Sequence, residues 1–459
     1  MNYVSTRGRA PQAGFIDVLL AGLASDGGLY VPETWPALSG EEIAAFAGRP
    51  YAEVAAAILR HFAGDEIDPE VLERICARAY ASFSHPAVAP LRQLSSNRFL
   101  LELFHGPTLA FKDIAMQVLG GLFEHALGAR GRTMTIVAAT SGDTGGAAAA
   151  AFAGLAGVRL VVLFPDGRVS DVQRRFMTTT GAANVRCVAV DGDFDACQAI
   201  LKALFADEAF ARDAELAAVN SINFARIAAQ SVYYFTAAAA LGAPGRPVAF
   251  AVPTGNFGDA YAGWAARRMG LPIEKIVVAT NANDIVARAL SQGVYRRGTA
   301  IATQSPAMDI QVASNFERLH FEYAGRGNLE TAAAFEAFER TGEMTLAPAI
   351  RAAMAEIFEG RSVSEAATTE AMRKSWRETG ELVDPHTAVA LAGADGAAHD
   401  GTPLVILSTA HPAKFPEAIA AAGLTPDVAR VEALGGLVER FDRLPADAAA
   451  VKAYVRAWT

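Results

Sequence analysis

Residues 133–164 read TMTIVAATSGDTGGAAAAAFAGLAGVRLVVLF, and this stretch decides the fold. Residues 133–139 form an apolar run typical of a buried strand, residues 145–153 are small residues typical of a helix, and residues 158–164 form a second apolar strand. Buried apolar strands separated by helices indicate a parallel sheet that is covered on both faces. The sequence therefore predicts an α/β protein.

The same alternation continues along the chain. We expect helices at about 170–179 and 194–205, and further strands at 185–190, 247–253, 276–279 and 404–408. The chain before residue 95 is different and predicts a helical unit. Ser39 and Glu42 match a capping box, and Asp68 followed by Pro69 is a capping residue with proline in the first turn. The proline-containing and serine-containing segment 84–97 is the best candidate for a domain boundary.

Composition excludes several classes of protein. The 459 residues are 52% hydrophobic and 19% charged, which is typical of a globular enzyme. A net charge of -9 gives no broad positive surface for nucleic acid, so we expect no nucleic-acid partner. The apolar residues 145–164 are interrupted by glycines and an arginine, so we expect no membrane span. Three scattered cysteines fit a reducing cytoplasm, and no Cys/His spacing predicts a metal site.

Three loops of the expected sheet have the composition of anion sites. They are TSGDTGG at 140–146, NSINFAR at 220–226 and PTGNFGD at 253–259. Hydroxyls and glycine amides at a helix start hold phosphate or carboxylate oxygens, Asn223 can cap the helix that follows it, and Arg226 can grip a phosphate with two N–H groups. The last loop lacks the Gly-Lys-Ser/Thr of a Walker loop. Each loop alone is more often structural than functional.

Residues 105–117, HGPTLAFKDIAMQ, place Lys112 where a loop gives way to a helix. Half-burial among apolar neighbours would lower the pKa of the Lys112 amine and make it a candidate Schiff-base lysine, although this stretch alone favours an ordinary amphipathic lysine. Asp113 suits the first helical turn, where a carboxylate meets unpaired backbone N–H groups. Lys414 is a competing amine in a less suitable context. Together, a Schiff-base lysine and two phosphate-type loops suit pyridoxal phosphate and a phosphorylated substrate.

At this point the sequence resembles the threonine synthases, within the fold-type II family of pyridoxal-phosphate enzymes, over nearly its whole length. The strings that carry the resemblance are YVSTRG (3–8), DGGLYVPE (26–33), HGPTLAFKD (105–113), TSGDTGG (140–146), NSINFAR (220–226), PTGNFGD (253–259), MDIQVASNFERL (308–319), DPHTAVA (384–390) and STAHPAKF (408–415). The MDIQ segment and the helical N-terminus resemble the longer bacterial and fungal class.

The resemblance implies two open, mostly parallel sheets with flanking helices, similar to the tryptophan synthase β subunit, and a helical N-terminal domain. We expect residues 1–95 to form that N-terminal domain, residues 96–129 and 216–459 the large cofactor-binding domain, and residues 130–215 the small α/β domain. We also expect a monomer or a weak homo-oligomer.

The resemblance also implies roles for individual residues. Lys112 matches the lysine that bears pyridoxal phosphate and shuttles protons, and Thr409 matches the hydroxyl residue that faces the pyridine nitrogen. Asp143 matches the position near the ring's phenolic oxygen, where its carboxylate must be protonated, water-bridged or balanced by a cation. The cofactor-phosphate loop comprises Gly255, Asn256, Phe257, Gly258 and Asp259. Positions that match ligands of the substrate's phosphate and carboxylate are Thr140, Ser141, Thr144, Asn220, Ser221 and Arg226.

The reaction implied by the resemblance converts O-phospho-L-homoserine and water to L-threonine and phosphate. In this hypothesis Lys112 removes the Cα proton, and loss of a further proton at Cβ allows the γ-phosphate to leave. Protonation at Cγ then makes Cβ electrophilic, and water adds there. Two alternatives stay open. The chain is a related phospho-lyase or threonine dehydratase that ends at 2-oxobutyrate, or it is a non-catalytic protein that binds phosphometabolites on the same scaffold.

Overall fold

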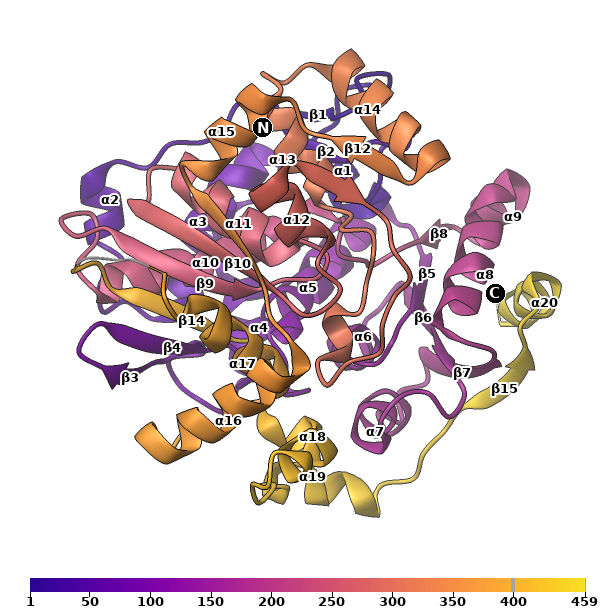
Figure 1. The fold of residues 1–459 in the computed structure, drawn as a ribbon. Helices are drawn as coiled ribbons and strands as arrows, with labels where there is room; N and C mark the ends of the chain where they lie inside the picture. Colours follow the sequence, from indigo (N-terminus) through magenta and orange to yellow (C-terminus); the bar gives the residue numbers. More distant parts are fainter. Residues whose placement is uncertain (398–400, 459) are drawn as a thin grey trace.

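The computed structural model describes residues 1–397 and 401–458, and two larger sheets organise this part of the chain (Figure 1). The first has six strands among the described residues, in the spatial order β13 (Phe358–Ser362), β10 (Ile273–Thr280), β9 (Val248–Pro253), β14 (Leu404–Ser408), β4 (Arg98–Glu102) and β3 (Leu91–Ser95). Its neighbouring strands are parallel except β3 and β4, which are antiparallel. The predicted α/β class is confirmed.

The second sheet contains the stretch from which the fold was predicted. Within the described residues its spatial order is β15 (Asp442–Pro445), β7 (Val185–Asp191), β6 (Val158–Pro165), β5 (Met134–Ala139) and β8 (Leu216–Ala217). Every neighbouring pair is parallel. The helix α6 (Asp143–Phe152) joins β5 to β6, so the predicted strand–helix–strand unit is confirmed to within about two residues at each end.

Three central helices lie between the two sheets. They are α5 (Lys112–Arg130), α6, and α10 (Phe224–Ala240), with α5 packing against both α6 and α10. Helix α10 is buried along nearly its whole length, and its predicted cap is confirmed because the Asn223 side chain accepts a hydrogen bond from the Ala225 N–H. Residues from these helices share one large apolar core with the N-terminal helices.

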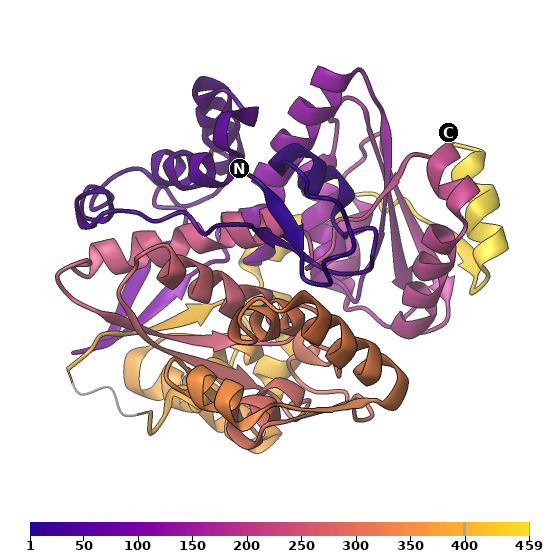
Figure 2. The same cartoon turned by 90° about the horizontal axis from the view of Figure 1, so that it is seen from above.

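The N-terminal residues pack on this central layer. They form the antiparallel pair β1 (Tyr3–Ser5) and β2 (Tyr30–Pro32) and the helices α1 (Phe15–Ala21), α2 (Gly40–Ala44), α3 (Tyr51–Ala63) and α4 (Pro69–Tyr80). Both predicted helix starts are confirmed, with a capping box at Ser39 and Glu42, and with Asp68 capping α4. Helix α3 contacts α10, and α4 contacts α5. Figure 2 shows the start of the N-terminal segment, in indigo, in front of the region between the two larger sheets.

The remaining helices and strands lie around the two sheets. Around the second sheet are α7 (Asp171–Thr178), α8 (Phe194–Ala206) and α9 (Glu208–Asp213). Around the first are α11 (Gly258–Arg268), α12 (Ile285–Gln292), β11 (Val294–Arg296), α13 (Phe316–Tyr323), α14 (Asn328–Thr341), β12 (Glu343–Thr345), α15 (Pro348–Ala355), α16 (Glu365–Thr379) and α17 (Pro385–Ala394). In the described part of the chain, no helix combines the length and apolar character that a membrane span requires.

The C-terminal segment connects the two sheets, which the sequence did not predict. After α18 (Pro416–Ala421) and α19 (Ala429–Glu432) the chain crosses to the second sheet, where β15 pairs with β7 and α20 (Ala448–Arg456) packs on α8 (Figure 1). The expected division had placed residues 216–459 with the first sheet. Strand pairing instead associates residues 216–217 and 442–445 with the second sheet and residues 91–95 with the first, while the division into domains itself stays a prediction.

Candidate active site

Three of the sequence motifs follow the carboxyl ends of neighbouring strands in the first sheet. Strands β9, β14 and β4 are adjacent and parallel, so their carboxyl ends meet. Loop 254–258 follows β9, Thr409 follows β14, and the loop that leads to Lys112 follows β4. Ligands of open α/β sheets bind outside the carboxyl ends of the strands, which makes this edge the candidate active site.

Backbone hydrogen bonds fix the loop before Lys112 to the segment after β14. The Phe111 N–H donates to the Thr409 carbonyl at 2.8 Å, and the His411 N–H donates to the Leu109 carbonyl at 3.0 Å. Leu109 has a φ of 59°, a left-handed conformation that is uncommon for a leucine and marks strain. These contacts set the start of α5, so Lys112 is held beside Thr409 with its side chain only 12% exposed.

Asp113 occupies the first turn of α5 as predicted, but its contacts differ from the expected ones. Its carboxylate accepts hydrogen bonds from the Thr108 N–H at 2.8 Å and the Thr108 hydroxyl at 2.7 Å. Asp113 therefore bonds to the loop that precedes the helix and stabilises its sharp turn. Gly106 permits this arrangement because a Cβ at that position would lie 2.4 Å from the Asp113 Cβ.

Asp143 lies between two lysine amines. Its Oδ1 is 2.7 Å from the Lys414 Nζ, and its Oδ2 is 3.4 Å from the Lys112 Nζ. Burial alone would raise the pKa of Asp143, but the charges of Lys414 and Lys112 outweigh burial and hold the pKa well below its usual range. Of the three states that the sequence left open for Asp143, these two contacts favour a carboxylate balanced by cations.

The competing amine is not available for chemistry. Lys414 is 1% exposed, and its Nζ also donates to the Thr108 carbonyl at 2.8 Å. Lys112 is more accessible and makes only the longer contact with Asp143. Burial lowers the pKa of Lys112, an effect that Asp143 opposes and that the charges of Lys414 and Arg226 increase. Lys112 is therefore the amine that is suited to act as a nucleophile.

Arg226 is a buried cation near Lys112. It lies in the first turn of α10, is only 3% exposed, and burial lowers the pKa of its guanidinium to about 10. Its Nε has no hydrogen-bond partner, and no carboxylate of residues 1–397 and 401–458 forms an ion pair with it. Burying an uncompensated charge costs roughly several kcal/mol, so this position suits the binding of an anion.

Loop 254–258 is held closely against the rest of the chain. A Cβ at Gly255 would lie 3.1 Å from the Ala307 carbonyl oxygen, and Phe257 has a φ of 63° at the start of α11. Asn315 joins this loop to the 220–226 loop, because its Nδ2 donates to the carbonyls of Asn256 at 3.2 Å and Ser221 at 3.0 Å. The two predicted anion loops are therefore neighbours.

The Asp259 side chain is bonded to two tyrosines of α10. Tyr233 and Tyr234, both on α10, donate hydrogen bonds to its Oδ1, and burial raises the pKa of Asp259 to about 6. A carboxylate would repel phosphate, so Asp259 can assist an anion site only through its backbone N–H. Its predicted part in cofactor binding is restricted in this way.

The remaining predicted ligands have mixed surroundings. The Thr140 hydroxyl accepts hydrogen bonds from the Gly142 and Gly145 N–H groups, both at 2.9 Å, so it shapes the turn at the start of α6. The Asn220 Oδ1 accepts from the Ile222 N–H at 3.2 Å, within its own turn. Ser141 is exposed, and Thr144 and Ser221 are half-buried. Substrate contacts of these five residues stay predictions.

Sequence reasoning missed the parts played by Lys414 and Asn315. Both lie inside motifs that carried the resemblance, STAHPAKF and MDIQVASNFERL, but neither motif indicates which distant residue it contacts. The Asp384 and His386 pair of the DPHTAVA motif was also left unassigned. His386 Nδ1 lies 2.7 Å from Asp384 Oδ2, and its Nε2 accepts from the Ala307 N–H at 3.2 Å, which supports the segment beneath Gly255.

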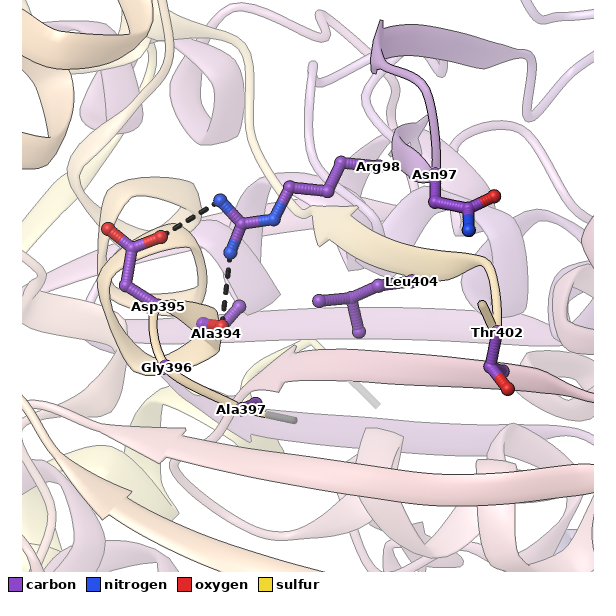
Figure 3. Close-up of a pocket in the computed structure, with 8 residues that line it drawn as sticks. All are labelled: Asn97, Arg98, Ala394, Asp395, Gly396, Ala397, Thr402 and Leu404. Carbon is purple, nitrogen blue, oxygen red and sulfur yellow. Dashed lines mark hydrogen bonds and ion pairs between the residues drawn. The ribbon is translucent and has the colours of Figure 1, made fainter. Parts of the chain in front are cut away.

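A surface cavity of ≈ 310 Å³ lies at the opposite ends of the same strands (Figure 3). Its lining residues are Asn97, Arg98, Ala394, Asp395, Gly396, Ala397, Thr402 and Leu404. They surround the amino ends of β4 and β14, where Arg98 pairs with Asp395 at 2.8 Å. Because that guanidinium is already paired and the motifs lie at the other ends, this cavity is not part of the candidate site.

The site can hold anions around a nucleophilic amine. Lys112, Lys414 and Arg226 are cationic, Asp143 pairs with the two lysines, and the backbone amides at the start of α11 add positive partial charge. Within residues 1–397 and 401–458, no group of three or more His, Cys, Asp or Glu side chains could hold a metal ion. The arrangement suits a phosphorylated substrate or cofactor.

Comparison with known proteins agrees with this chemistry. Family models described as "Threonine synthase N terminus", "Pyridoxal-phosphate dependent enzyme" and "Threonine synthase, C-terminal" match residues 2–80, 86–357 and 387–455. The threonine synthase of Pseudomonas aeruginosa is 48% identical, over 99% of this chain and 98% of that protein.

Solved structures give the same result for the fold. A threonine synthase from Brucella melitensis, solved with pyridoxal phosphate bound, is 48% identical with a TM-score of 0.97 and covers 100% of this chain and 99% of that one. The yeast threonine synthase is 36% identical with a TM-score of 0.93, covering 99% and 98% of the two chains. The expected fold-type II architecture and longer class are thereby confirmed, and the chain belongs to the threonine synthase family of pyridoxal-phosphate-dependent enzymes.

Proposed function

We propose that this chain converts O-phospho-L-homoserine and water to L-threonine and inorganic phosphate, as a carbon–oxygen lyase of threonine biosynthesis. Membership of the threonine synthase family supports the reaction. The structural observation that carries it is Arg226, a buried guanidinium without a paired carboxylate, close enough to Lys112 for its charge to lower the pKa of that amine. A phosphorylated amino acid supplies the missing anion.

The residues present fit pyridoxal phosphate. Lys112 is a partly accessible amine of lowered pKa. The start of α11 presents backbone N–H groups on a loop in which a Cβ at Gly255 would crowd the backbone of Ala307 and Met308. We assign the cofactor phosphate to Gly255, Asn256, Phe257 and Gly258, and the ring to Thr409 and Asp143. When bound, the cofactor supplies an electron sink for the carbanion that forms at the substrate's Cα.

The protein's own groups then bind the substrate and move its protons. The Lys112 amine removes the proton from Cα and returns a proton later in the reaction, because it is the accessible amine of the site. Arg226 binds a substrate oxyanion and keeps the reacting carbons in register with that amine. Burial around Lys112 limits the entry of water to the reacting carbons.

Product analysis tests this proposal. Purified protein is incubated with O-phospho-L-homoserine, and threonine, phosphate and 2-oxobutyrate are measured. Equal amounts of threonine and phosphate support the synthase. Oxobutyrate without threonine indicates the related phospho-lyase, and conversion of threonine itself to oxobutyrate indicates a dehydratase. Absence of all products, with no cofactor trapped at Lys112 by borohydride, indicates a binding protein.

Two further assignments belong to this proposal. The three cysteines are free and buried, which supports a reducing compartment such as the cytoplasm. A monomer or weak homo-oligomer remains our expectation, and light scattering of the purified protein measures it.

A further inference from the structure

We propose that Lys414 is a positioning residue for the reaction: it holds Asp143 as a fixed carboxylate and thereby leaves Lys112 as the amine that gives up its proton. The inference rests on the proposed function in one respect, since it takes Lys112 to be the cofactor-bearing amine. It concerns a residue whose motif suggested only a competing nucleophile.

The contacts of Lys414 make it a permanent partner of Asp143. The two charged groups are 2.7 Å apart, and each is almost fully buried, with side-chain exposures of 1% and 4%. The Thr108 carbonyl accepts a second hydrogen bond from the Lys414 Nζ, and the Phe176 ring centroid lies 5.2 Å from the same atom. The ammonium is thus enclosed by acceptors and an aromatic face.

Asp143 is consequently shared unequally between the two amines. Lys414 and Gln173, whose Nε2 donates at 3.1 Å, both act on Oδ1, whereas Lys112 lies 3.4 Å from Oδ2. Lys112 therefore gains less from the carboxylate and still experiences the positive charge of Lys414. Two like charges near one carboxylate favour loss of the proton from the less well-held amine.

Lys414 is also linked to the position of Lys112 through the backbone. Thr108 accepts from Lys414 with its carbonyl and donates to Asp113 with its N–H and hydroxyl. Asp113 follows Lys112 directly in α5, so the lysine at residue 414 stabilises the turn that aims Lys112. Loss of Lys414 then affects both the charge and the orientation of the reacting amine.

The other charged groups around the cluster come from three helices. Asp113 on α5 and His386 on α17 act electrostatically on Lys414 and Asp143 respectively, and Arg226 on α10 acts on Lys112. Arg226 favours loss of the Lys112 proton in the same direction as Lys414. Substitution of Lys414 removes one of these two cations and leaves Arg226 in place. The pH at which Lys112 loses its proton therefore shifts, but Lys112 still titrates.

The test measures the pH dependence of Lys112 itself. Cofactor is removed from the full-length protein, pyridoxal phosphate is added between about pH 6 and about pH 10, and the product is fixed with borohydride and located at residue 112 by peptide mass spectrometry. In Lys414→Met the midpoint of labelling moves up by roughly one unit or more, because the like charge is gone and Asp143 pairs with Lys112 alone. Lys414→Arg keeps the wild-type midpoint.

Lys452→Met is a matched control. Lys452 is also 2.7 Å from an aspartate, Asp207, and 5.7 Å from the ring centroid of Phe210, but it lies on α20 and outside the candidate site. Its midpoint stays at the wild-type value. An unshifted midpoint in Lys414→Met overturns the proposal, and so does an equal shift in the control. If Lys414→Met does not fold, two other variants decide. Asp143→Asn must lower the midpoint of labelling, because Asp143 raises the pKa of Lys112, and Lys414→Arg must keep the wild-type midpoint. Failure of either result overturns the proposal.

This measurement separates the inference from the proposed function. Labelling at residue 112 needs no substrate, so a wild type that forms no threonine leaves the labelling result valid. Conversely, normal threonine formation with an unshifted Lys414→Met midpoint overturns only the role of Lys414.

Discussion

Arg226→Met tests whether the buried guanidinium is kept for a ligand. Methionine replaces the apolar volume but not the charge. A hydrogen bond to a charged group contributes about 1.5–3 kcal/mol, so kcat/KM for O-phospho-L-homoserine falls roughly 10- to 150-fold. Cofactor content stays near that of the wild type, because the cofactor phosphate is assigned to loop 254–258.

Thermal stability distinguishes this role from a structural one. Arg226 has an Nε without a partner, so its removal relieves a buried charge and the melting temperature of the cofactor-loaded protein stays the same or rises. Arg318→Met is the matched control. Arg318 is 0% exposed and burial also lowers its pKa to about 10, but its guanidinium donates to the Tyr30 carbonyl at 3.0 Å and to Asn315 and Ile222.

The two variants should therefore behave in opposite ways. Arg318→Met leaves three acceptors, two of them buried, without this donor. A buried acceptor without a partner costs roughly 1–3 kcal/mol, so the melting temperature falls clearly. Steady-state kinetics, cofactor absorbance and thermal melts are measured on both proteins. If Arg226→Met loses cofactor in proportion to activity, or melts as early as Arg318→Met, the guanidinium is structural and the assignment to substrate is wrong.

Three other variants test separate parts of the site. Lys112→Ala abolishes threonine and phosphate formation and leaves no borohydride-fixed cofactor at residue 112, and residual turnover at the wild-type rate would exclude Lys112 as the reacting amine. Gly255→Ala places a Cβ 3.1 Å from the Ala307 carbonyl oxygen and 3.2 Å from the Met308 Cα, so cofactor retention after dialysis drops roughly tenfold. Gly128 has open space around it, and Gly128→Ala is the control that retains cofactor normally. Burial raises the pKa of Asp259 to about 6, above its value in the unfolded chain, so its contribution to stability is lost as pH rises from about 4 to about 6, by roughly 3 kcal/mol. Asp259→Asn removes this dependence, and melts at about pH 4.5 and about pH 7 should differ less in the variant than in the wild type.

Local patterns predicted local structure well, for physical reasons that particular residues illustrate. The caps at Ser39, Asp68 and Asn223 act on backbone N–H groups two or three residues away, so a short window of sequence contains both partners. The strand–helix–strand unit at 133–164 was predicted because burial on both faces leaves a continuous apolar run. The apolar neighbours of Lys112 indicated that half-burial would lower its pKa, but alone they favoured an ordinary amphipathic lysine. Only the structure shows that the side chain is largely buried and that burial lowers its pKa.

Interactions between distant residues were beyond the reach of these patterns. Asp143 and Lys414 are far apart in the chain, and they follow strands of the two different sheets, β5 and β14. Neither local sequence therefore indicates its partner. The role of the Thr140 hydroxyl could not be predicted from the local sequence either. A threonine before a helix suits both a ligand and a cap, and only the positions of the Gly142 and Gly145 N–H groups show that it caps. The crossing of β15 to β7 likewise depends on where the chain goes after α19.

The balance of charge in the site explains why Asp143 is retained as a carboxylate. Lys112, Lys414 and Arg226 would bring three positive charges into a buried region if nothing opposed them, and such a cluster would destabilise the fold before any ligand arrived. Asp143 compensates one charge and is bonded most closely to the lysine that takes no part in the chemistry. The remaining positive charge is on Lys112 and on Arg226. A cofactor aldehyde can react with the Lys112 amine, and a substrate oxyanion can pair with Arg226. The carboxylate therefore stabilises the empty fold without occupying the groups that the reaction needs.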